Sequence, residues 1–178
     1  MLAAAGIEFE IMPPEVAERS DPDFALGELT TWNALRKGLA VARAHPGRVV
    51  LAADTLVALD GKVIGKPNDL EEAVRILQEL SGRVHQVCSA VFVGHLAGEG
   101  TSVFQEISHV RFKRLSLTAI RNYVARVDPL DKAGAYAVQG DGADIIEQIE
   151  GSSSNVVGLP MERTVPLLAR FGIRSKKD

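Results

Sequence analysis

Apolar and polar residues alternate along several stretches of the chain, a pattern typical of β-strands with one buried face. The clearest case is residues 7–11, where apolar side chains alternate with glutamates shortly before two prolines. Turn residues such as Asp60-Gly61 predict hairpins, and we expect the two longest strands to pair antiparallel. Stretches rich in apolar and β-branched residues predict the other strands, at 49–59, 62–65, 84–96, 102–112, 136–138 and 143–149.

Four further stretches predict helices, because residues that typically begin or end a helix flank helix-forming sequence. The first is rich in Leu, Ala and Arg and is followed by Pro46-Gly47. Hairpins and helices are interspersed along the chain, so we expect an α/β fold: a twisted mixed β-sheet flanked by helices, with a central cleft as the natural place for a ligand. The predicted helices cover residues 26–45, 70–80, 116–127 and 160–172.

Length and composition fit one globular domain over residues 1–178, since 46% of the residues are hydrophobic and 24% are charged. The formal charge of -3 gives no basic field, so we do not expect a nucleic-acid partner. No apolar run approaches the roughly 18 residues of a membrane span, so we expect no membrane association. Cys88 is the single cysteine, which predicts a buried thiol and a protein of the reducing cytoplasm.

Candidate chemistry begins with Asp54, an acidic residue inside an otherwise apolar predicted strand. An unpaired carboxylate is costly to bury, so Asp54 needs a cation or a cleft. Lys66 lies between Gly65 and Pro67 at the far end of the predicted hairpin, where it can meet an anionic ligand. The two residues suggest a site for a metal and a phosphate. The alternative is that Asp54 simply forms an ion pair with Lys66.

Two segments rich in small residues could let a ligand approach the backbone closely. One is residues 131–140, where glycines and alanines surround polar side chains such as Gln139. The other is the polar stretch 151–160, whose backbone N–H groups could bind phosphate. Taken alone, the second segment is more often only a connector between elements.

These motifs together resemble the Maf family of proteins over essentially the whole chain. The matching stretches follow one another in the order and spacing of that family. They are Ala53-Asp54-Thr55, Gly65-Lys66-Pro67, Leu80-Ser81-Gly82 with His85, Asp131-Lys132-Ala133-Gly134-Ala135-Tyr136 with Gln139-Gly140, and Gly151 to Pro160.

The resemblance implies an enzyme that hydrolyses nucleoside triphosphates between the α and β phosphates, with Mg²⁺ or Mn²⁺ as cofactor and with dTTP and UTP as the substrates of the most similar branch. It also implies a homodimer. By position, Asp54 matches the catalytic acid/base and, with Glu18, a metal ligand. The positions that match substrate-binding residues are Lys37 and Lys66 for the triphosphate and Thr55 and Gln139 for the base.

The start of the chain departs from the Maf pattern, which opens with a strand and a Ser-x-Ser-x-Arg-Arg loop. Residues 1–6 are instead typical of the last turns of a helix that a glycine stops, so we expect that upstream sequence is missing. Without that loop, an alternative function is a nucleotide-binding or cell-division regulatory protein that lost turnover. A purely structural α/β domain is the third alternative.

Overall fold

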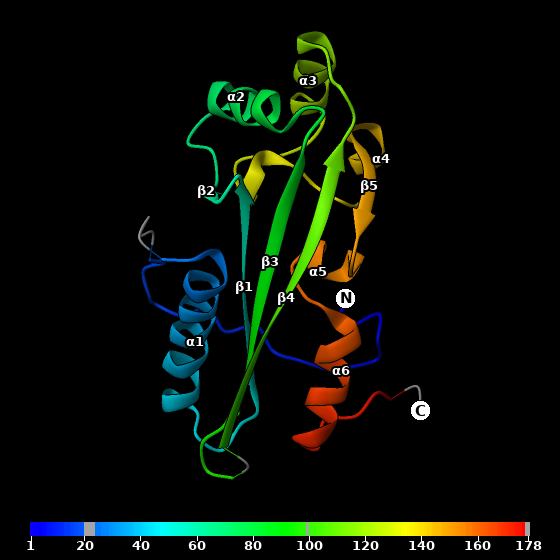
Figure 1. The fold of residues 1–178 in the computed structure, drawn as a ribbon. Helices are drawn as coiled ribbons and strands as arrows, with labels where there is room; N and C mark the ends of the chain where they lie inside the picture. Colours follow the sequence, from blue (N-terminus) through cyan, green and yellow to red (C-terminus); the bar gives the residue numbers. More distant parts are fainter. Residues whose placement is uncertain (20–23, 99, 177–178) are drawn as a thin grey trace.

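The computed structural model describes residues 1–19, 24–98 and 100–176, and they form one five-stranded sheet with helices on both faces (Figure 1). The strand order is β2-β1-β3-β4-β5. The strands are β1 (Val50–Leu59), β2 (Lys62–Ile64), β3 (Val84–His95), β4 (Gly100–Phe112) and β5 (Ile146–Glu150). The helices are α1 (Leu26–Ala44), α2 (Leu70–Leu80), α3 (Leu117–Val124), the 3₁₀ turn η1 (Ala133–Ala135), α4 (Gly142–Ile145), α5 (Ser153–Val157) and α6 (Met161–Arg170).

All four strand pairings among the described residues are antiparallel. The expected α/β fold with a flanked sheet is therefore confirmed, whereas the expected mixture of parallel and antiparallel strands is wrong. A tight turn can join only antiparallel neighbours, and such turns follow β1 and β3. The connection from β4 to β5 is long, and the sequence does not reveal in which direction such a connection brings the chain back.

The two faces of the sheet carry different helices, as Figure 1 shows: α1 lies on one side, and α5 and α6 lie on the other. Alternate residues of β3 point to opposite faces, as a strand requires. Phe92 packs under α1 with Ala42, whereas Val91 and Val93 pack with Leu167 of α6 and its neighbours. The sheet is therefore buried on both faces along its centre.

A third apolar cluster lies where α2 and α3 cover one end of the sheet (Figure 1). Its largest fully buried side chains include Leu77, Phe112 and Tyr123. Residues from the segment 133–138, which follows α3, also pack into this cluster. The cluster therefore anchors residues 131–140, the first of the two segments that the sequence analysis describes as rich in small residues.

The predicted strand at residues 7–11 is absent, although its alternating pattern is real. Only Ile7 is buried, whereas Phe9 is 54% exposed and Ile11 is 78% exposed. The chain around this segment is irregular. Before it, the Gly6 carbonyl accepts a hydrogen bond from the Lys176 N–H in the tail after α6, and after it the Arg19 N–H donates to Asn33 of α1. Alternation determines which side chains share a side, but a strand also needs a partner for its backbone.

The predicted strand at 136–138 is also wrong, and that at 143–149 begins later, at Ile146, because α4 precedes it. A side chain takes the place of a strand partner at 136–138. The Tyr123 hydroxyl accepts a hydrogen bond from the Ala137 N–H at 3.0 Å and donates one to the Ala137 carbonyl at 3.4 Å. The backbone polar groups of Ala137 are therefore satisfied without a sheet.

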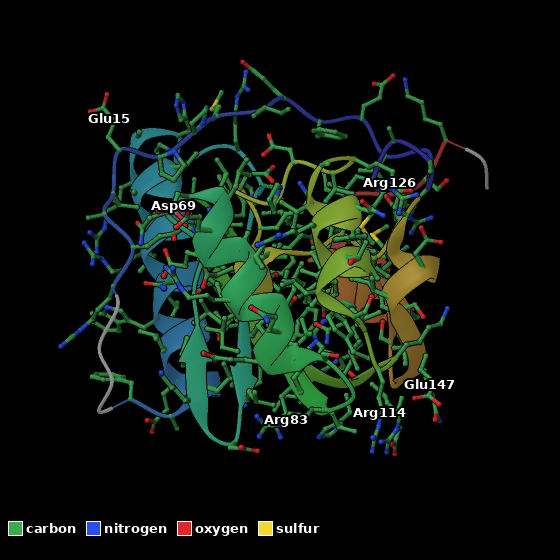
Figure 2. The ribbon with its side chains drawn as sticks, turned by 90° about the horizontal axis from the view of Figure 1, so that it is seen from above. Glu15, Asp69, Arg83, Arg114, Arg126 and Glu147 are labelled. Carbon is green, nitrogen blue, oxygen red and sulfur yellow. The ribbon has the colours of Figure 1, made fainter. Side chains whose placement is uncertain are left out.

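Charged side chains such as Glu15, Arg126 and Glu147 lie around the outside of the fold (Figure 2). Cys88 is a free, fully buried thiol, as the sequence predicted. Trp32 on α1 is 44% exposed. Within residues 1–19, 24–98 and 100–176, no helix has the length and apolar character needed to cross a membrane.

Candidate active site

A cleft of about 1100 Å³ opens along one edge of β1. β1 pairs with β3 over Val50–Ala58, but it pairs with β2 only over Val57–Leu59. The outer edge of residues 50–56 thus has no strand partner among the described residues. Side chains from both faces of the sheet therefore line the cleft at this edge. All six site residues expected from the sequence line this cleft: Glu18, Lys37, Asp54, Thr55, Lys66 and Gln139.

Asp54, Lys37 and Glu18 form a bridged group of charges on the α1 side of the sheet. The Lys37 ammonium donates to Asp54 Oδ1 and to Glu18 Oε1, each at 2.6 Å. The side chain of Asp54 is only 4% exposed, whereas that of Glu18 is 48% exposed. One cation therefore joins a buried carboxylate to one that faces solvent. The alternative that Asp54 pairs with Lys66 is wrong, because the partner of Asp54 is Lys37.

Asn33 holds this group in place and was not found from the sequence. It is almost fully buried, and its amide Nδ2 donates to Asp54 Oδ2 at 3.4 Å and to the Arg19 carbonyl at 3.2 Å. Its Oδ1 accepts from the Arg19 N–H at 2.9 Å. Asn33 precedes Lys37 by four residues, so the two share one face of α1. That spacing is the signal that could have revealed Asn33.

The electrostatics of the group follow from burial and from the shared lysine. Burial raises the pKa of Asp54 above its ordinary value, although the hydrogen bond from Lys37 opposes the rise. The hydrogen bond from Lys37 lowers the pKa of Glu18. Burial alone would lower the pKa of Lys37, but its bonds to Asp54 and Glu18 raise it overall. The site therefore holds a carboxylate that binds a proton more readily than an exposed aspartate does.

Lys66 lies just after β2, in the segment that leads to α2, and lines the cleft with an exposed side chain. Among the described residues, no hydrogen bond or ion pair occupies its ammonium group. Lys132, by contrast, donates to Asp131 and to the Asp128 carbonyl. Lys66 is therefore a cation of the cleft that remains available to an anionic ligand.

Thr55 faces the opposite side of the sheet from Asp54, as adjacent residues of a strand do. Its hydroxyl lies 2.8 Å from the Ser89 hydroxyl and 3.4 Å from the Gly158 carbonyl. The stretch predicted as a polar loop at 151–160 contains the short helix α5, which Ser152 caps and Gly158 ends in the left-handed conformation. Asn155 of α5 is fully buried against β3 and β4.

The segment from Tyr136 to Gln139 forms another wall of the cleft. The Tyr136 hydroxyl lies 2.8 Å from His85 Nε2, and both rings pack edge-on against Phe112. Burial lowers the pKa of His85 to about 4, so its ring is neutral at physiological pH. His85 thus lies behind the wall of the cleft and supports Tyr136, while Gln139 is exposed.

A metal ion would have few protein ligands here. No group of three His, Cys, Asp or Glu residues that could hold a metal exists in the described part of the chain. Asp54 and Glu18 each use one oxygen for Lys37, which leaves one further carboxylate oxygen on each. Two carboxylates suit a magnesium ion whose other ligands are water and substrate phosphates, but they do not make a zinc site.

The fold and the cleft define an α/β protein with a charged cleft, of the kind that can take a small molecule, at the open edge of its sheet. A family model described as Maf-like protein matches residues 1–171. A dTTP/UTP pyrophosphatase of Symbiobacterium thermophilum is 45% identical over 172 residues, which cover 97% of this chain and 88% of the relative. Those of Dictyoglomus turgidum and Bacillus pumilus are each 40% identical over 173 residues, covering 97% of this chain and 90% of theirs. The chain therefore belongs to the Maf family.

Proposed function

We propose that this protein hydrolyses dTTP and UTP to the nucleoside monophosphate and pyrophosphate, with Mg²⁺ or Mn²⁺ as cofactor. The relatives that are 40–45% identical to it carry the name dTTP/UTP pyrophosphatase. The observation that supports the proposal best is the buried Asp54 carboxylate, which shares the Lys37 ammonium with Glu18 at the open edge of the sheet. The proposal is also supported by the cleft itself, because all six residues that the family resemblance assigns to this chemistry line it.

The reaction is the attack of a water oxygen on the α phosphorus, with cleavage of the bond to the oxygen that bridges to the β phosphate. Asp54 accepts the proton that the water loses, and pyrophosphate leaves with the electrons of the broken bond. Among the described residues, Asp54 Oδ2 has only the 3.4 Å bond from Asn33, so it can accept a further hydrogen bond from water. The raised pKa of Asp54 makes it a better base than an exposed aspartate.

The charge of the cleft supports the need for a divalent cation. Its described lining includes five cationic residues (Arg19, Lys37, Lys62, Lys66 and Lys132) and four anionic ones (Glu18, Asp54, Asp60 and Asp131). These charges nearly cancel, so the net positive charge of the lining is too small to neutralise a triphosphate. Glu18 and Asp54 would hold the metal, which would supply positive charge to the phosphates and polarise the attacking water. Lys66 would bind the phosphates directly, since Lys37 is already engaged by two carboxylates.

The test is the release of pyrophosphate from dTTP, UTP, CTP and 7-methyl-GTP with Mg²⁺ or Mn²⁺, using the unaltered chain, Asp54→Asn and Asp144→Asn. Asp144 is an exposed aspartate that pairs with Arg126 outside the cleft, so it is the matched control. We expect turnover of dTTP and UTP that is lost in Asp54→Asn and kept in Asp144→Asn. Binding of dTTP without turnover would instead support the nucleotide-binding regulatory protein considered from the sequence.

Two further properties belong to the proposal. We expect a homodimer in the cytoplasm, as the family resemblance implies. Light scattering of the purified protein measures the first property, and a monomer at micromolar concentration would contradict it.

A further inference from the structure

A chain of buried hydrogen bonds leads from α5 to Thr55 in the cleft, and it begins at Asn155. The side chain of Asn155 is fully buried and fully bonded. Its Nδ2 donates to the Val87 carbonyl at 3.1 Å and to the Ser108 hydroxyl at 2.9 Å. Its Oδ1 accepts from the Ser89 N–H at 3.1 Å. A carbonyl only accepts and a backbone N–H only donates, so the amide of Asn155 has a single possible orientation.

Ser89 is the second member of the chain, and its hydroxyl carries one hydrogen. That hydroxyl lies 2.9 Å from the backbone carbonyl of Asn155 and 2.8 Å from Thr55 Oγ1. Because the carbonyl can only accept, Ser89 donates to Asn155 and is left to accept from Thr55. Ser89 is fully buried, so no water competes for its hydrogen bonds.

Thr55 is the last member, and its single hydrogen has two acceptors within the protein. These are the Ser89 hydroxyl at 2.8 Å and the Gly158 carbonyl at 3.4 Å. Whichever of them receives the hydrogen, Thr55 Oγ1 keeps only lone pairs for a ligand in the cleft that it lines. A threonine without this network could instead turn its hydrogen towards the ligand.

We infer that Ser89 and Asn155 are positioning residues that commit the Thr55 hydroxyl to accepting a hydrogen bond from the base, and that this favours uracil and thymine over cytosine. The inference rests on the proposed function and refines it. Uracil and thymine carry a ring N–H between their two carbonyl groups, whereas cytosine has an unprotonated acceptor nitrogen at that place. An acceptor facing an acceptor leaves both unsatisfied, which is the strongest way for a site to reject a similar ligand.

The test compares Ser89→Ala with Ser108→Ala by the ratio of kcat/KM for UTP to that for CTP. Both serines are fully buried and both bond the α5 region, but only Ser89 contacts Thr55. We expect the ratio to fall about tenfold in Ser89→Ala, because the Gly158 carbonyl at 3.4 Å is too distant to hold the Thr55 hydrogen alone. The ratio should stay unchanged in Ser108→Ala. Thr55→Ser keeps the hydroxyl and should keep the ratio, whereas Thr55→Val should lose it.

An equal fall in both serine variants would overturn the inference, since it would show that the serines only hold α5 in place. A ratio near one in the unaltered protein would overturn it as well. Titration with the α,β-methylene analogues of UTP and CTP separates this inference from the proposed hydrolysis. If nothing is turned over but the UTP analogue binds more tightly, and Ser89→Ala removes that preference, hydrolysis fails and the inference stands. Equal or absent binding of the two analogues would overturn the inference.

Discussion

Replacing Lys37 by methionine tests the electrostatic account of the site, because methionine keeps most of the apolar stem and removes only the ammonium. Asp54, with a side chain 4% exposed, then loses the one cation that bonds it within the described part of the chain. Breaking a buried ion pair from one side typically costs about 3 to 5 kcal/mol. The cost has an upper bound, however, because Asp54 can take up a proton instead of remaining charged.

This upper bound on the cost rises with pH, so Lys37→Met should lose more stability at high pH than at low pH. Protonating an aspartate of ordinary pKa 3.8 costs about 5 kcal/mol at roughly pH 7.5 and about 1.6 kcal/mol at roughly pH 5. A carboxyl whose pKa is raised on folding contributes stability that is present below its ordinary pKa and lost as the pH rises through the folded value. Lys37→Met should therefore lose about 3 kcal/mol at the higher pH and no more than about 1.6 kcal/mol at the lower one.

Urea denaturation at both pH values measures the two losses of unfolding free energy. The double variant Lys37→Met with Asp54→Asn is the internal control, since the neutral amide removes the buried charge. It should be more stable than Lys37→Met at the higher pH and nearly equal to it at the lower one. A loss that is the same at both pH values and is not relieved by Asp54→Asn would refute the reasoning, and would show that Lys37 acts through packing alone.

Three further predictions follow from other parts of the structure. The pKa of His85 is lowered to about 4, so the unaltered protein should lose about 3 kcal/mol of stability as the pH falls from 6.5 to about 4, and urea denaturation of His85→Gln should show no such loss from this residue. Gly38→Ala would place a Cβ 2.0 Å from a ring atom of Phe92, so thermal denaturation should show the free energy of unfolding lowered by about 2 kcal/mol. Gly47→Ala would place its Cβ with no atom within 4 Å and should change the free energy of unfolding little. Removing divalent metal with EDTA should abolish pyrophosphate release, and Mg²⁺ should restore it; undiminished release in EDTA would contradict the two-carboxylate metal site.

The sequence alone revealed those site residues that are unusual among their immediate neighbours in the chain. Asp54 stands out because an ionised group inside an apolar strand is costly, and Lys66 stands out between a flexible and a rigid residue. Glu18 and Lys37 came only from the family resemblance. No local pattern shows that a residue of α1 and one of the irregular segment before it meet at β1, because that meeting depends on how α1 packs on the sheet.

The errors have a similar physical cause. Residues 7–11 alternate as a strand does, but only the folded chain shows that none of the described strands pairs with them. Residues 136–138 have strand-like composition, yet the Tyr123 hydroxyl satisfies the backbone that a neighbouring strand would have bonded. The polar stretch around Asn155 was interpreted as a loop that either binds phosphate through its backbone or only connects two elements. Its burial becomes visible only when α5 packs on β3 and β4.

The most direct test of the central claim, that water attacks the α phosphorus with Asp54 as base, is turnover of dTTP in water enriched in a heavy oxygen isotope, followed by mass spectrometry of both products. The account predicts one heavy oxygen in the monophosphate and none in pyrophosphate, with no labelled product from Asp54→Asn. Heavy oxygen in pyrophosphate, release of single phosphates, or undiminished labelling by Asp54→Asn would contradict it.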